Sequence, residues 1–279
     1  MTKSSDAETF QAEIIRRYDA PMYRAMLEVY GDQIHPGFLE ADDDDLREAA
    51  LRATARLAEL AHISAGASVL ETACGVGGTA RYLAASRGAR VVATNIARSQ
   101  LAIAEEWTRG APGADRIRFE FADYHALPYG ESSFDVYWCQ DSLLFSTDKP
   151  LALAEAARVV RPGGTIAISD LVVIGTPAPD AAALLTEISA PGFWSPDDYR
   201  QGLAAAGFEA IIAEDWSRHA LPSFDRLTAD IAAKRERLAA IASEADVEET
   251  LERYALWCRA TRTGNLGWVA FAGTRLKGP

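Results

Sequence analysis

A run of small residues, VLETACGVGG from Val69 to Gly78, is the first stretch of the sequence whose residue types and spacing could do chemistry. Two apolar residues precede an acid, Glu71, and glycines follow at positions 75, 77 and 78. A strand that runs into a glycine-rich turn and a helix gathers backbone N–H groups at one point. The turn therefore predicts a site where a ligand approaches the backbone closely.

Three kinds of ligand compete for this turn. A P-loop needs a lysine after the glycines, and none follows Gly78, which excludes that kind of phosphate site. A dinucleotide site needs GxGxxG, but Ala73 stands where the first glycine belongs. S-adenosylmethionine (SAM) carries no phosphate, so its turn need only clear space for an amino-acid moiety and a ribose. The acid Glu71 near the strand end also favours SAM.

The position of Asn95 supports a nucleoside-like ligand. This residue follows Gly75 by 20 positions and ends the apolar run RVVATNI, which is where a ribose-binding side chain belongs. An asparagine can donate to one hydroxyl group and accept from another. An ordinary turn asparagine is the alternative.

The elements that must position these residues alternate between strand and helix. Apolar runs predict strands at 69–70, 90–96, 117–121, 134–139 and 165–171, and helices fit 78–86, 98–108 and 149–160. This alternation indicates βαβ units and a parallel sheet. A helix over 196–206, a strand over 208–216 and a final strand at LGWVAFAGTRL follow. We predict an α/β fold with a Rossmann-like, seven-stranded, mostly parallel sheet.

Helices are expected to cover this sheet at both ends of the chain. Apolar positions at helical spacing occupy 8–30 and 45–61, and amphipathic segments occupy much of 217–262. We predict a single domain over 1–279, with an N-terminal helical lid at 1–62 and a SAM-binding core at 63–171. The remaining sheet, with a helical cap at about 217–262, would take 172–279.

Composition limits the partners of the chain. A net charge of −12 and a pI near 4.9 argue against nucleic acid and against anionic membranes. No apolar stretch approaches the roughly 20 residues of a membrane span, and the N-terminus resembles no secretory signal. Three separated cysteines, without a CxxC pair, suit a reducing compartment. We expect a cytoplasmic monomer or homodimer without a metal site, acting on a small molecule.

Two further segments carry a family resemblance. FADYHALPYGESSFDVYWCQD and LAEAARVVRPGGTIAISDL resemble class I SAM-dependent methyltransferases across about 68–171. Four more segments resemble the sarcosine/dimethylglycine N-methyltransferases within that class. They are YGDQIHPG (30–37), TNIARSQ (94–100), WCQDSLLFS (138–146) and TGNLGWVAF (263–271).

The resemblance implies roles for individual residues in cofactor binding. The methionine part of SAM would lie beside Ala73, Gly75, Gly77 and Gln140, and Glu71 would shape the cofactor site. The ribose and adenine would lie beside Asn95, Ile96, Gln100, Asp123 and Tyr124. His35 would close over the site from the N-terminal segment.

The sequence also contains candidate catalytic and substrate-binding residues. Asp141 follows the fourth predicted strand at the edge where ligands bind in open α/β sheets, and His35 is the second catalytic candidate. The alternatives are a helix-capping carboxylate and a packed histidine. Phe145 replaces a histidine of the family's pattern, which favours a more apolar substrate. Tyr18 and Trp194 are the other predicted substrate contacts.

The predicted function is SAM-dependent methylation of a small molecule. The first expectation is N-methylation of a sarcosine- or dimethylglycine-like amine. The alternative is O- or C-methylation of a more apolar metabolite, which Phe145 favours. A nicotinamide-dependent oxidoreductase would need the missing first glycine and an acid at Asn95. A SAM-binding protein without catalysis is the third class.

Overall fold

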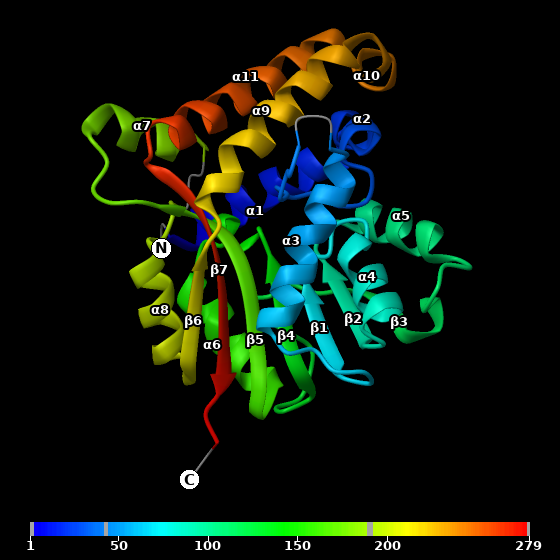
Figure 1. The fold of residues 1–279 in the computed structure, drawn as a ribbon, viewed down its shortest axis with the longest axis vertical. Helices are drawn as coiled ribbons and strands as arrows, with labels where there is room; N and C mark the ends of the chain where they lie inside the picture. Colours follow the sequence, from blue (N-terminus) through cyan, green and yellow to red (C-terminus); the bar gives the residue numbers. More distant parts are fainter. Residues whose placement is uncertain (1–2, 42–43, 189–191, 278–279) are drawn as a thin grey trace.

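A computed structural model describes residues 3–41, 44–188 and 192–277. Seven strands form one sheet in the order β3-β2-β1-β4-β5-β7-β6, as Figure 1 shows. They are β1 (Ser68–Thr72), β2 (Arg90–Asn95), β3 (Ile117–Phe121), β4 (Phe134–Gln140), β5 (Val160–Val173), β6 (Phe208–Asp215) and β7 (Leu266–Arg275). The first five pair in parallel, and β7 is antiparallel to both β5 and β6. The predicted seven-stranded, mostly parallel sheet is therefore confirmed.

The sheet lies between two helical layers. Alternate strand residues face opposite sides: Val69 packs into one core cluster and Leu70 into another. Residues of α3 (Leu46–Leu60), α4 (Gly78–Ser86) and α5 (Arg98–Thr108) belong to the first cluster. Residues of α6 (Lys149–Val159) and α8 (Pro196–Ala205) belong to the second. The carboxyl ends of the parallel strands thus stay open to ligands between these layers.

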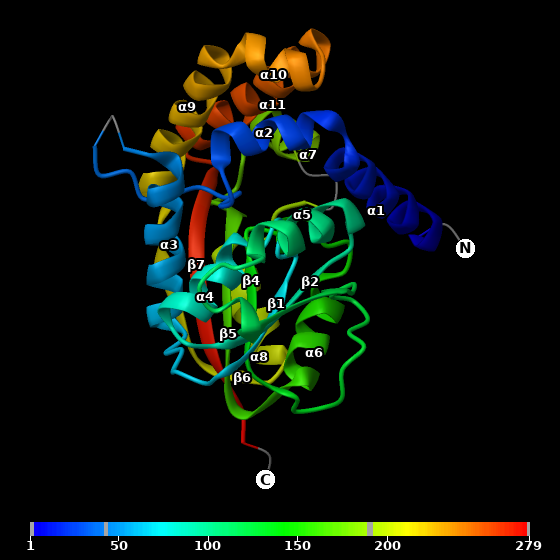
Figure 2. The same cartoon turned by 90° about the vertical axis from the view of Figure 1, so that its right-hand side faces the viewer.

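The N-terminal and C-terminal helices meet above that edge (Figure 2). The N-terminal pair is α1 (Lys3–Asp19) and α2 (Pro21–Tyr30), and the cap is α9 (Ser217–Ala233), α10 (Arg235–Ile241) and α11 (Glu244–Arg262). Met26 and Val29 of α2 share a third apolar cluster with Leu227 and Ile231 of α9. The lid and the cap are therefore joined by their own small core, separate from the sheet.

Four details differ from the sequence predictions. The helix expected over 8–30 breaks at Pro21, because proline has no N–H to continue a helix but suits its first position. The helix α3, which falls within the predicted lid range 1–62, packs against β5 and β7. The helix α7 (Pro179–Ile188) was not predicted. The strand β5 begins at Val160, ahead of the strand predicted at 165–171, with a register shift against β4.

Two further observations concern the cysteines and the helices. Cys74, Cys139 and Cys258 are all buried free thiols, as their small size and apolar character allow. No helix in the described ranges is long and apolar enough to cross a bilayer.

Candidate active site

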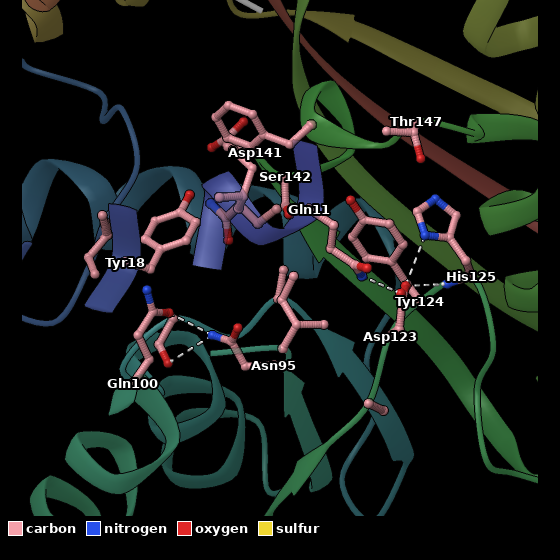
Figure 3. A pocket seen from close by; sticks show the side chains of 18 of the residues that line it. Gln11, Tyr18, Asn95, Gln100, Asp123, Tyr124, His125, Asp141, Ser142 and Thr147 are labelled. Carbon is pink, nitrogen blue, oxygen red and sulfur yellow. Dashed lines mark hydrogen bonds and ion pairs between the residues drawn. The ribbon is translucent and has the colours of Figure 1, made fainter. Parts of the chain in front are cut away.

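A cavity of about 250 Å³ lies at the carboxyl edge of the sheet. The residues predicted for the site that line it are Tyr18, Ala73, Gly75, Asn95, Ile96, Gln100, Asp123, Tyr124, Gln140, Asp141 and Phe145. The lining residues that were not predicted are Phe10, Gln11, Ile14, Tyr23, Ile34, Ala122, His125, Ser142 and Thr147. Figure 3 shows that α1 side chains face the strand ends across this space. Sequence-distant segments thus build one cavity.

Two non-glycine residues beside this cavity have left-handed backbone conformations. Ala73 (φ 55°) follows β1, and Asp141 (φ 52°) follows β4. The two strands are neighbours, and Thr72 pairs with Cys139. Non-glycine residues adopt positive φ at an energetic cost and concentrate at functional sites. The chain is therefore strained at the two strand ends where the sequence predicts ligand contacts.

The glycines of the turn have different roles. Gly75 (φ +55°) lines the cavity, and a Cβ there would find only Ile34 and the Tyr23 hydroxyl, at 3.7 and 3.9 Å. Gly77 lies outside it, and its Cβ would approach the Phe119 ring to 2.7 Å. Gly77 is therefore required for packing and for its φ of +78°, whereas Gly75 keeps space open for a ligand.

The end of β2 provides a rigid amide pair. Asn95 donates from Nδ2 to Gln100 Oε1 at 2.6 Å and accepts from the backbone N–H of Ala97 at 3.0 Å. The other Gln100 group, Nε2, is buried without a partner in the part of the chain that the structure describes. An unmet buried donor is costly, so this nitrogen is available to a polar ligand.

A second cavity of about 40 Å³ adjoins the glycine turn and contains Glu71. The side chain is 3% exposed, and its Oε2 has no partner among the described residues. Burial raises the pKa of Glu71 to about 8, and the Arg81 guanidinium opposes that shift. Glu71 therefore keeps its proton at neutral pH in the ligand-free protein.

The same small cavity contains His35, which lies outside the larger one. Its Nδ1 donates to the Pro36 carbonyl at 2.9 Å, and its Nε2 lies 3.2 Å from the Thr54 hydroxyl. Gln140 Nε2 is 3.3 Å from the same ring. Burial lowers the pKa of His35 to about 4, so the ring is neutral at physiological pH. These contacts fit a packed, hydrogen-bonded histidine better than a catalytic base.

Asp123 is fully engaged by neighbouring side chains. Its Oδ1 accepts from the backbone N–H and the Nδ1 of His125, at 2.8 and 2.9 Å. Its Oδ2 accepts from Gln11 of α1. Burial alone would raise the pKa of Asp123, but the hydrogen bonds from His125 and Gln11 hold it below its usual value. His125, which was not among the residues predicted for the site, is held at its other nitrogen by Ser146 Oγ at 2.8 Å.

Asp141 is the acid with unused capacity in the larger cavity. Its Oδ1 accepts from Trp268 Nε1 at 2.8 Å and from Ser169 Oγ at 2.9 Å. Its Oδ2 is buried and has no partner within the described ranges. Burial raises the pKa of Asp141 to about 7, although both hydrogen bonds oppose that shift. A carboxyl group with this pKa can take up or release a proton near neutral pH.

The predicted substrate contacts divide into two groups. Tyr18 and Phe145 line the larger cavity. Trp194 does not, and this prediction is corrected. Its ring packs edge-on against Tyr199 at 5.2 Å and covers Gly202, where a Cβ would lie 2.7 Å away. Trp194 is therefore part of the packing between α8 and the sheet.

Comparison with known proteins identifies the family. A family model for a methyltransferase domain matches residues 70–168. The 27-O-demethylrifamycin SV methyltransferase of Amycolatopsis mediterranei is 33% identical over 262 residues, which cover 92% of this chain and 94% of the relative. The chain belongs to the class I SAM-dependent methyltransferases. This methyltransferase is also 29% identical to the sarcosine/dimethylglycine N-methyltransferase of Halorhodospira halochloris, over 86% and 87% of the two chains.

A solved structure agrees with this assignment. A crystal structure assigned to a sarcosine dimethylglycine methyltransferase from Galdieria sulphuraria superposes with a TM-score of 0.83 at 27% identity. The superposition covers 91% of this methyltransferase and 98% of that chain. The predicted resemblance to the sarcosine/dimethylglycine branch is thereby confirmed, and the protein is a SAM-dependent enzyme that methylates small molecules.

The residues present fit SAM as the cofactor. Gly75 keeps a ligand-sized space open, and the buried Glu71 Oε2 and Gln100 Nε2 have no hydrogen-bond partner among the described residues. Glu71 Oε2 can bind an amino group of SAM, and Gln100 Nε2 can donate to a hydroxyl oxygen. Both lie at the carboxyl edge where cofactors bind in open α/β sheets.

Proposed function

We propose that the enzyme methylates a hydroxyl group on a largely apolar small molecule, with Asp141 as the general base. The observation that carries this proposal is a buried Asp141 whose Oδ2 has no partner in the described chain. Asp141 borders a cavity that also contains Phe10, Tyr18 and Phe145. When bound, SAM supplies a methyl group already activated by its sulfonium.

The charge of the lining supports an acceptor without a carboxylate. In the described part of the chain no lysine or arginine lines the larger cavity. Glycine, sarcosine and dimethylglycine each carry a carboxylate, and such groups are usually held by charge-assisted hydrogen bonds. Asp123 and Asp141 would repel one. The lining therefore favours a neutral acceptor over the sarcosine-like amine that the sequence suggested first.

The pKa of Asp141 favours an acidic hydroxyl. Phenols ionise near pH 10, as the tyrosine side chain does. A carboxylate with a pKa of about 7 is thus about three units from a phenol, a gap that a positioned base overcomes during the reaction. We propose a phenolic or enolic hydroxyl as the acceptor group.

The chain's own residues would then act by position and by exclusion of water. Asp141 accepts the hydroxyl proton, and the aromatic side chains of Tyr18 and Phe145 hold the apolar body of the acceptor. The α1 helix covers the cavity and keeps water out. Proximity, orientation and desolvation supply most of the remaining rate for an activated methyl donor.

A matched acceptor panel tests this proposal. The purified enzyme receives SAM with a deuterated methyl group and, separately, 1-naphthol, 1-naphthylamine, sarcosine or dimethylglycine. Mass spectrometry and NMR then identify the product and the methylated atom. We expect O-methylation of 1-naphthol and loss of that activity in Asp141→Asn. Turnover of sarcosine or dimethylglycine, with none of the naphthol, would contradict the proposal.

The sarcosine-like amine is the second candidate. The 29% identity to the Halorhodospira halochloris enzyme and the Galdieria sulphuraria structure support it. In this case Asp141 would take the proton of the substrate's ammonium group and free the nitrogen lone pair for methylation, and the product NMR of the same panel would show an N-methyl group.

A further inference from the structure

The carboxylate of Asp141 is held by two donors on one oxygen. Trp268 Nε1 and Ser169 Oγ both donate to Oδ1, at 2.8 and 2.9 Å. The backbone N–H of Asp141 also donates to the Ser169 carbonyl at 2.8 Å. Oδ2 is the oxygen without a partner among the residues described. The two carboxylate oxygens are therefore distinguished by the protein.

The Trp268 indole that makes one of these bonds is itself rigidly held. Trp268 lies on β7 and is completely buried. Its backbone carbonyl accepts from Trp216 N–H at 2.8 Å, and its N–H donates to Ser217 Oγ at 3.1 Å. Its ring packs edge-on against Trp216 and Phe38, with centroids 5.0 and 5.7 Å apart. The indole N–H thus has one available direction, toward Asp141.

We propose that Trp268 is a positioning residue which, together with Ser169, occupies Oδ1 of Asp141 and so reserves Oδ2 for the proton of the acceptor. This inference rests on the proposed function, because it assigns a role to the residue that orients the base. Without these donors the carboxylate could rotate, and the oxygen presented to the acceptor would vary.

The groups around Asp141 predict how its titration changes when the hydrogen-bond donors Trp268 and Ser169 are removed. The ionisable groups that interact with Asp141 are Asp170 on β5 and Cys139 on β4. Lys149 on α6 acts on Asp170 in the opposite sense. The hydrogen bonds from Trp268 and Ser169 are the influences that favour the ionised form of Asp141. Removing one therefore disfavours the carboxylate and moves its titration to higher pH.

The test compares Trp268→Phe with Trp216→Phe in the full-length enzyme. Trp216 belongs to the same aromatic cluster, but its Nε1 donates to Glu214 at 2.9 Å. The variants are compared in the pH dependence of kcat/KM with 1-naphthol. A second readout is the pH titration of the Asp141 carboxyl carbon by 13C NMR, assigned with Asp141→Asn.

In Trp268→Phe we expect the acid limb of the kcat/KM profile to move up by about one pH unit. At pH values below that limb, kcat/KM should be about tenfold lower than in wild type. Ser169→Ala should move it in the same direction, and Trp216→Phe should leave it in place. An unmoved limb in Trp268→Phe, or an equal shift in Trp216→Phe, overturns the positioning role.

The same variants separate this role from the proposed function. If Asp141→Asn retains the acid limb, Asp141 is not the base and the proposed mechanism fails. The 13C titration still decides the positioning role in that case. An upward shift of the Asp141 titration in Trp268→Phe supports it, and an unchanged titration overturns it.

Discussion

Glu71→Gln should make the stability of the protein less dependent on pH. Glu71 is buried at the end of β1, its Oε2 has no partner within the described ranges, and its pKa is raised to about 8 from an ordinary 4.5. Between these two pH values the unfolded chain has released this proton and the folded protein keeps it. The stabilising contribution of the protonated Glu71 is therefore fully present below pH 4.5 and is lost as the pH rises toward 8.

The size of the effect follows from the shift. Each pH unit inside this window changes the free energy of unfolding by at most about 1.4 kcal/mol per group. Glutamine carries no such proton, so the stability of Glu71→Gln relative to wild type should rise by about 2.5 kcal/mol between pH 5.5 and 7.5. The other buried acids titrate in both proteins and cancel in the comparison.

Urea unfolding of the ligand-free proteins, followed by tryptophan fluorescence, measures this difference. Glu105→Gln is the control, because Glu105 is exposed on α5 and its carboxylate is solvated in both states. The free energy of unfolding of Glu71→Gln, relative to wild type, should rise with pH. The free energy of unfolding of Glu105→Gln, relative to wild type, should stay constant. Parallel curves for Glu71→Gln would refute a neutral, buried Glu71.

Three other variants test the surrounding site. Burial lowers the pKa of His35 to about 4, so the neutral His35 loses its stabilising contribution as the pH falls below 6.5. Thermal scans at pH 7 and 4.5 measure how much less stable each protein becomes at the lower pH. In His35→Gln that decrease should be about 2–3 kcal/mol smaller than in wild type. Phe145→His should raise KM for 1-naphthol about tenfold and leave the calorimetric Kd for SAM unchanged, since Phe145 is assigned to the acceptor. Tyr199→Phe should destabilise the protein by about 1–3 kcal/mol, because it removes a donor to the buried Asp170; an unchanged melting temperature would contradict that assignment.

Residues at strand ends could be placed from sequence. Asn95, Asp123 and Asp141 each follow an apolar strand, and the carboxyl ends of parallel strands meet at one edge. The cavity brings all three together. The glycine turn was recognisable for the same reason, although only contacts with Phe119 show why Gly77 is a glycine.

Residues whose roles depend on tertiary packing could not be placed. His125 joins the site because its loop lies between Asp123 and Ser146, and Gln11 because the break at Pro21 lays α1 across the strand ends. No local pattern fixes either arrangement. The helix α7 carried a usable signal, a proline followed by an acid in the first turn.

Trp194 shows the limit of composition as a guide to function. An aromatic residue between two elements suits a binding pocket and a core equally well, and only the space above Gly202 decides between them. His35 is a similar case. Its type suits acid–base chemistry, whereas its burial among Pro36, Thr54 and Gln140 is that of a packed, hydrogen-bonded residue.

The most direct test of Asp141 as a base on a hydroxyl acceptor is a single-turnover series with phenols of graded acidity at pH 8. Phenols that are already ionised need no base, and those that keep their proton do. We expect Asp141→Asn to transfer methyl groups to the most acidic phenols at nearly the wild-type rate. With the least acidic phenols this variant should be about 100-fold or more slower than wild type. An equal loss of rate across the whole series would contradict the assignment of Asp141 as the base.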